Sequence, residues 1–186
     1  MRKVIFAINI TINGLADHTT VIADDELHDF FSNLLNDVDV VLMGRKTYQL
    51  MENFWPSAYH DPRSTKSMLR FADKYNPIKK IIFSKTLTEV NWENSQLANK
   101  DLSGIVSELK KHKGKYILAG SISIADQLLE LNLIDEFRFV VHPIITGNGK
   151  QLFDGIDKVK KLQLIDSKKL SSGAIVLHYK KSEGAT

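Results

Sequence analysis

Residues 38–48 constrain the fold of this chain more than any other stretch. They begin with an apolar run rich in β-branched residues, which is typical of a strand buried on both faces. Gly44 ends the run, Arg45 and Lys46 follow, and Thr47 is the expected cap of the helix after them. A strand that passes through glycine into a helix presents backbone N–H groups to an anion, and the cations add charge. The stretch is either a phosphate site or a turn with solvated cations.

Two further junctions of the same kind follow along the chain. The apolar run Lys79–Phe83 leads into Ser84 and Lys85, and the run Tyr116–Ala119 leads into Gly120 and another helix. Strands that alternate with helices favour a mainly parallel sheet, and ligands bind beyond the carboxyl ends of its strands. We therefore expect all three junctions to lie along one rim of the sheet.

The other patterns fit the same architecture. The opening strand pattern, residues 4–12, places Ile5, Ala7, Asn9, Thr11 and Asn13 on a face that turns polar, which suits either a cleft wall or a strand emerging into solvent. Further elements are expected at Asp24–Asn36, Ser64–Tyr75, Asp101–Lys111 and 122–131 as helices, at Phe137–Val141 as a strand, and at 162–179 as a hairpin. The predicted fold is α/β, with a mostly parallel central sheet flanked by helices and an antiparallel C-terminal hairpin, in a single domain over residues 1–186.

Composition excludes several classes of site and partner. The chain has no cysteine, which rules out disulfides and thiolate ligands, and its six histidines are scattered, so no metal site is expected. A net charge of +3 does not indicate nucleic acid, and no apolar stretch is long enough to span a membrane. Asn9, Thr11 and Asn13 interrupt the apolar start too early for a signal peptide. We expect a cytoplasmic protein with a small-molecule substrate.

Several of these motifs carry a resemblance to a known family. Residues 44–47 resemble the Gly-Arg-x-Thr segment of the dihydrofolate reductase-like superfamily, including the reductase domain of riboflavin biosynthesis (the RibD C-terminal domain). Later motifs resemble the same family in order: Gly120-Ser121, Leu133-Ile134-Asp135-Glu136, Pro143, Gly147-Asn148-Gly149 and Leu152-Phe153. The resemblance extends from Ile8 to Tyr179, and it implies the dihydrofolate reductase-like fold.

This resemblance implies an NADPH-dependent reductase that transfers a hydride to a C=N or C=O bond of a small organic substrate. The riboflavin-pathway 5-amino-6-(5-phosphoribosylamino)uracil reductase domain is the model for that activity. Cations beside two of the three junctions favour NADPH over NADH, because NADPH carries an additional ribose phosphate. The residues that the resemblance assigns to the cofactor are Ala7, Gly44, Arg45, Lys46, Thr47, Ser84, Lys85, Gly120, Ser121, Ile122 and Ser123. A homodimer is a further expectation.

The sequence does not single out one catalytic residue. Relatives often have an aspartate where Asn13 stands, and dihydrofolate reductases place a substrate-binding carboxylate in the helix that here contains His28 and Asp29. Asn13 and His28 are therefore the catalytic candidates, and Trp55 is either a substrate-side residue or a packing anchor. Because no acid matches cleanly, dihydrofolate is not the expected substrate. An NADP-binding protein without turnover and a true dihydrofolate reductase remain as alternatives.

Overall fold

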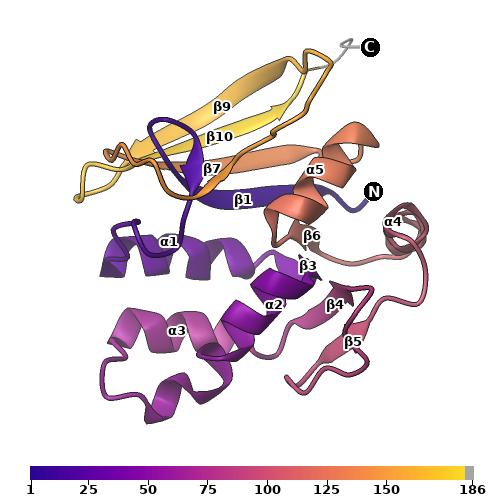
Figure 1. Cartoon of the computed structure of the whole chain (residues 1–186), viewed down its shortest axis with the longest axis horizontal. Helices are drawn as coiled ribbons and strands as arrows, with labels where there is room; N and C mark the ends of the chain where they lie inside the picture. The colour runs from indigo at the N-terminus through magenta and orange to yellow at the C-terminus, as the bar shows by residue number, and fades with distance from the viewer. Residues whose placement is uncertain (183–186) are drawn as a thin grey trace.

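A computed structural model of the chain describes residues 1–182 (Figure 1). Its eight-stranded sheet has the order β5 (Ser95–Leu97), β4 (Lys79–Phe83), β3 (Val38–Gly44), β6 (Tyr116–Ala119), β1 (Val4–Thr11), β7 (Glu136–His142), β10 (Ile175–Lys181) and β9 (Leu162–Lys169). The strands from β5 to β7 pair in parallel, whereas β10 and β9 form an antiparallel hairpin at one edge. A small ladder joins β2 (Leu15–Ala16) to β8 (Lys150–Gln151). The predicted α/β architecture is confirmed.

Helices cover both faces of the sheet. Their bounds are α1 (Asp25–Leu35), α2 (Arg45–Glu52), α3 (Lys66–Tyr75), α4 (Leu102–Lys111) and α5 (Ile122–Glu130), with a 3₁₀ helix η1 (Trp55–His60). On one face, Val106 of α4 and Leu128 of α5 share a core with Phe6 of β1. On the other face, Phe71 of α3 packs in a second core with Val41 of β3. Two buried faces explain why the central strands read as continuous apolar runs.

Side-chain caps define several helix starts as the sequence indicates. Asp24 accepts a hydrogen bond from the Leu27 N–H at 2.8 Å, and Asp101 accepts one from the Gly104 N–H at 2.8 Å. The predicted capping role of Thr47 is wrong, since α2 begins at Arg45 and Gly44 is its N-cap. The helix therefore begins three residues earlier than a cap at Thr47 would place it.

The sequence patterns missed the short elements. β5 has three residues and lies at the sheet edge, η1 follows α2, and the β2–β8 ladder pairs two residues with two. The strand pattern over residues 4–12 extends one residue too far, since Ile12 follows the end of β1 and is 62% exposed. Within residues 1–182, no helix combines the length and the hydropathy needed to cross a membrane.

Candidate cofactor and substrate site

The three junctions meet on adjacent strands, as the sequence predicts. Gly44 lies opposite Phe83 in the parallel pairing of β3 with β4, which puts Ser84 at the end of the neighbouring strand. On the other side of β3, the Gly120 N–H donates to the Leu42 carbonyl at 2.8 Å. The carboxyl ends of β4, β3 and β6 therefore form one continuous rim of the sheet.

Two of the junctions also contact each other directly. The Gly44 N–H donates to the Ser121 hydroxyl at 3.1 Å, and a Cβ on Gly44 would lie only 2.8 Å from the Ser123 hydroxyl. Gly44 has an extended backbone, with φ −82° and ψ 162°, before α2 begins. Neither α2 nor α5 has a side-chain cap at its start, so their first N–H groups remain for an anion.

Gly120 is needed for a reason that differs from the one the sequence suggests. The family resemblance implies that a side chain there would block a cofactor's pyrophosphate. A Cβ on Gly120 would instead lie 2.7 Å from Val41 Cγ1, 3.1 Å from Met43 Cγ and 3.3 Å from the Leu42 carbonyl oxygen. The missing side chain therefore allows β6 to pass close to β3, and any cofactor contact at Gly120 involves its backbone.

Positive charge gathers at this rim without acidic partners. Arg45, Lys46 and Lys85 are exposed, and none of them pairs with a carboxylate among residues 1–182. The Ser84 hydroxyl accepts the Leu87 N–H at 2.9 Å and so fixes the turn that carries Lys85. Uncapped helix starts and exposed cations together suit a ligand with more than one phosphate.

The face of β1 that turns polar is covered by α1. Ala7, Phe31 and Trp55 pack against one apolar cluster, and Trp55 also lies 6.2 Å from the His28 ring, edge to face. His28 Nδ1 lies 2.9 Å from the Asp24 carbonyl oxygen. Because a carbonyl oxygen only accepts, Nδ1 carries the proton, and Nε2 has no partner among the described residues. His28 and Trp55 thus lie together, as a substrate-side pair would.

The other two polar candidates have partners elsewhere. Asp29 forms an ion pair with Arg70 at 2.6 Å, which turns its carboxylate toward α3 rather than toward β1. Asn13 accepts from the Thr11 hydroxyl at 2.8 Å and donates to the Thr146 carbonyl at 2.8 Å. Both ends of the Asn13 amide therefore hold the loop after β1.

Sequence reasoning missed His142, the last residue of β7. It is fully buried and lies 3.2 Å from Asn9 across the parallel pairing of β1 with β7. Burial lowers the pKa of the His142 imidazole below its ordinary value. The register of β1 with β7 would have revealed the pair, but no sequence pattern fixes that register.

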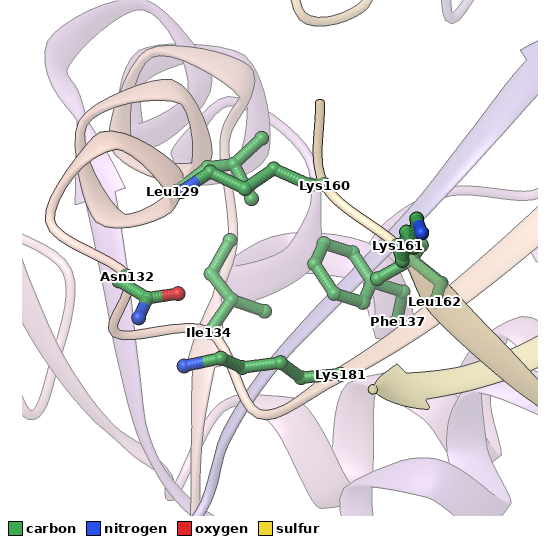
Figure 2. A pocket seen from close by; sticks show the side chains of 8 residues that line it. All are labelled: Leu129, Asn132, Ile134, Phe137, Lys160, Lys161, Leu162 and Lys181. Atoms are coloured by element: carbon green, nitrogen blue, oxygen red, sulfur yellow. The ribbon is translucent and has the colours of Figure 1, made fainter. Parts of the chain in front are cut away.

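Two pockets lie away from this rim. Figure 2 shows the smaller one, where Lys160, Lys161 and Lys181 surround an apolar floor that includes Ile134 and Phe137. Its volume of about 10 Å³ is enough for one water molecule and not for a cofactor.

The second pocket has a volume of about 430 Å³ and is lined by Glu52 and Glu93, whose carboxylates would repel a phosphate. No cluster of three potential metal ligands occurs within residues 1–182. The rim therefore remains the candidate site for an anionic cofactor.

Comparison with known proteins decides the family. The model described as the RibD C-terminal domain matches residues 2–176. The chain belongs to the RibD C-terminal domain family. The uncharacterized protein YyaP of Bacillus subtilis is 30% identical over 182 residues, covering 96% of this chain and 94% of YyaP.

Solved structures of RibD-like proteins share the fold. A pyrimidine reductase-like protein of Corynebacterium diphtheriae has a TM-score of 0.65 at 15% identity, covering 98% of this chain and 92% of that one. The diaminohydroxyphosphoribosylaminopyrimidine deaminase/5-amino-6-(5-phosphoribosylamino)uracil reductase of Thermotoga maritima has a TM-score of 0.67 at 18% identity, covering 97% and 57%. The RibD-type chain described here therefore has a riboflavin-pathway reductase-like fold.

Proposed function

We propose that this chain is an NADPH-dependent reductase that transfers a hydride to a C=N or C=O bond of a small organic substrate. The observation that carries the proposal is the rim itself. There the Gly44 and Ser121 junctions meet, two helices start without side-chain caps, and Arg45, Lys46 and Lys85 have no acidic partner among residues 1–182. Such a rim fits the pyrophosphate and the ribose phosphate of NADPH.

In this proposal, different parts of the chain bind the cofactor, bind the substrate and supply a proton. Bound NADPH would supply the hydride, while the protein binds, orients and shields the reactants. The helix starts and cations hold the phosphates, and the side of β1 under α1 receives the substrate. His28 is the acid–base residue that this arrangement favours, because its Nδ1 is held by the Asp24 carbonyl while its Nε2 has no partner among residues 1–182 and would carry the transferred proton.

The riboflavin-pathway reductases supply the first substrate to test. We expect NADPH oxidation with 5-amino-6-(5-phosphoribosylamino)uracil or a related aminopyrimidine, followed as the loss of reduced nicotinamide absorbance. Dihydrofolate should give no turnover at an enzymatic rate of about 1 per second or more, because Asp29 is committed to Arg70.

The same assay separates the alternatives. Tight NADPH binding without oxidation by any carbonyl or imine acceptor would favour an NADP-binding protein without turnover. Rapid turnover of dihydrofolate would favour a true dihydrofolate reductase. Failure to bind NADPH would contradict the proposal itself. A homodimer and a cytoplasmic location complete the proposal, and light scattering and cell fractionation test them.

A further inference from the structure

A chain of hydrogen bonds runs through the buried imidazole of His142. The Ile22 N–H donates to His142 Nδ1 at 3.4 Å, and His142 Nε2 lies 3.2 Å from Asn9 Oδ1. A backbone N–H can only donate, so Nδ1 must carry the lone pair and Nε2 must carry the proton. His142 therefore donates to Asn9, and the Asn9 amide has its oxygen toward the histidine.

The protonation state of His142 supports this direction. The imidazole is 0% exposed, and burial holds its pKa below the ordinary value of 6.5. A second proton on Nδ1 would face the Ile22 N–H, placing two donors against each other. The neutral form with the proton on Nε2 is thus the form that the fold accommodates.

The tautomer of His142 determines which end of the Asn9 amide is left without a partner. Its oxygen is occupied by His142, so the NH₂ group is left, and no described residue accepts a hydrogen bond from it. Asn9 is half-buried and follows Ala7 on the same face of β1, where side chains alternate with a period of two. Ala7 packs against the same apolar cluster as Phe31 and Trp55. A fixed, donor-only group therefore lies beside the proposed substrate side of the site.

We propose that Asn9 is the substrate-anchoring residue and that His142 is the positioning residue that orients it. The substrate class is then a compound with a carbonyl oxygen near its reducible bond, as in a pyrimidinone ring. The Asn9 amide nitrogen donates to that oxygen, and His142 prevents the amide from turning its acceptor toward the substrate. This inference rests on the proposed reductase function and adds the feature by which the substrate is recognised.

Paired probes test the anchoring role directly. Uracil presents carbonyl acceptors, and 2,4-diaminopyrimidine presents donors at the same positions. Each is titrated at about pH 8 into the full chain, with and without NADPH, while side-chain amide signals are followed by NMR. In the wild type, uracil should shift the Asn9 NH₂ signals and should bind more tightly than the diamine.

Asn9→Asp is the informative variant, because it keeps an acceptor for His142 and replaces the free donor by an acceptor. It should weaken uracil at least about tenfold and reverse the preference toward 2,4-diaminopyrimidine. Asn33→Asp is the matched control, since Asn33 is exposed on α1 and its side chain bonds to no described residue. The control should leave the ratio of the two affinities unchanged.

The positioning role of His142 is measured separately from the anchoring role of Asn9. Two-bond nitrogen–proton spectra of the wild type should show His142 protonated on Nε2 and not on Nδ1. His142→Phe should weaken uracil about fivefold with unchanged NADPH affinity, and His142→Gln, which can still donate to Asn9, should recover most of that loss. The spectra need only the wild-type protein, so they remain decisive even where a variant fails to fold.

Three results would overturn the inference. These are an Nδ1-protonated His142, Asn9 signals that uracil leaves unshifted with and without NADPH, or an Asn9→Asp variant with the wild-type preference. Failure of the reductase function is distinguishable, because it is read from NADPH binding and oxidation. The probe titrations are read from Asn9 itself and require no turnover.

Discussion

Basic side chains at the two ends of the parallel strands have opposite surroundings. Near the start of β7, three basic groups converge on Glu136: Lys3 at 2.6 Å, Arg138 at 3.0 Å and His178 at 3.0 Å. At the carboxyl ends, Arg45, Lys46 and Lys85 are exposed and have no carboxylate partner within residues 1–182. Charges at the first place satisfy one another and stabilise the fold. The charges at the carboxyl ends are left for a ligand. Substitutions around Glu136 should therefore change stability, and substitutions at the rim should change ligand affinity.

The largest effect is expected from Glu136→Ala. Burial alone would raise the pKa of Glu136, but hydrogen bonds from Lys3 and Arg138 hold it below its ordinary value. Removing the carboxylate leaves Arg138, whose side chain is 15% exposed, without its partner. The free energy of unfolding should fall by about 3 kcal/mol, toward the low end for a buried pair because Lys3 is half-exposed. Urea denaturation measures this loss.

Glu108→Ala is the control for that experiment. Glu108 also pairs with a lysine, Lys100 at 2.5 Å, but both side chains are more than half exposed. Such a pair contributes about 0.5 kcal/mol or less. Equal losses of stability for the two variants would contradict the view that the charges around Glu136 stabilise the fold.

Substitutions at the two rim glycines, Gly120 and Gly44, should differ in how much stability they cost. Gly120→Val forces a branched side chain against Val41 and the Leu42 carbonyl, which should cost about 1–3 kcal/mol of stability. A Cβ at Gly44 would lie 2.8 Å from the exposed Ser123 hydroxyl, which can rotate away, and at an ordinary contact distance of 3.5 Å from the Ser121 hydroxyl, so Gly44→Ala should change stability less. Thermal unfolding of both variants checks the order. A Gly120→Val variant of wild-type stability would show that the close approach of β6 to β3 is not required.

His142, which is buried, and His178, which is partly buried, predict how stability depends on pH. Burial lowers the pKa of His142, and burial together with Arg138 lowers the pKa of His178. The unfolded chain therefore binds protons below pH 6.5 that the folded chain does not, and stability falls as the pH drops below that value. Each histidine contributes a slope of at most about 1.4 kcal/mol per pH unit.

His178→Gln should reduce this acid sensitivity. Urea denaturation of the variant and the wild type, repeated at several pH values from about 8 to about 5, gives the two slopes. A variant that loses stability as steeply as the wild type would show that His178 does not titrate differently on folding.

Sequence patterns predicted much of the architecture because each signal was local. Glycine after a buried run, Asp24 and Asp101 before apolar helices, and Gly173 between two strand patterns each specify a nearby conformation. The rim then followed from the alternation of strands and helices. Features that depend on distant pairing were not predictable.

Two examples show this limit. The bond between Asn9 and His142 joins residues 133 positions apart and depends on the register of β1 with β7. The need for Gly120 likewise depends on how closely β6 approaches β3, which no local pattern specifies. Both therefore required the three-dimensional structure.

The central claim is that the rim binds the additional phosphate of NADPH and thereby selects NADPH over NADH. Affinities of NADPH and NADH for the wild type and for Arg45→Ala, measured by titration calorimetry, test it most directly. The wild type should bind NADPH at least about tenfold more tightly than NADH, a difference of about 1.4 kcal/mol. Arg45→Ala should lose affinity for NADPH far more than for NADH while its stability stays unchanged. Equal losses for both cofactors, or no wild-type preference, would contradict the account.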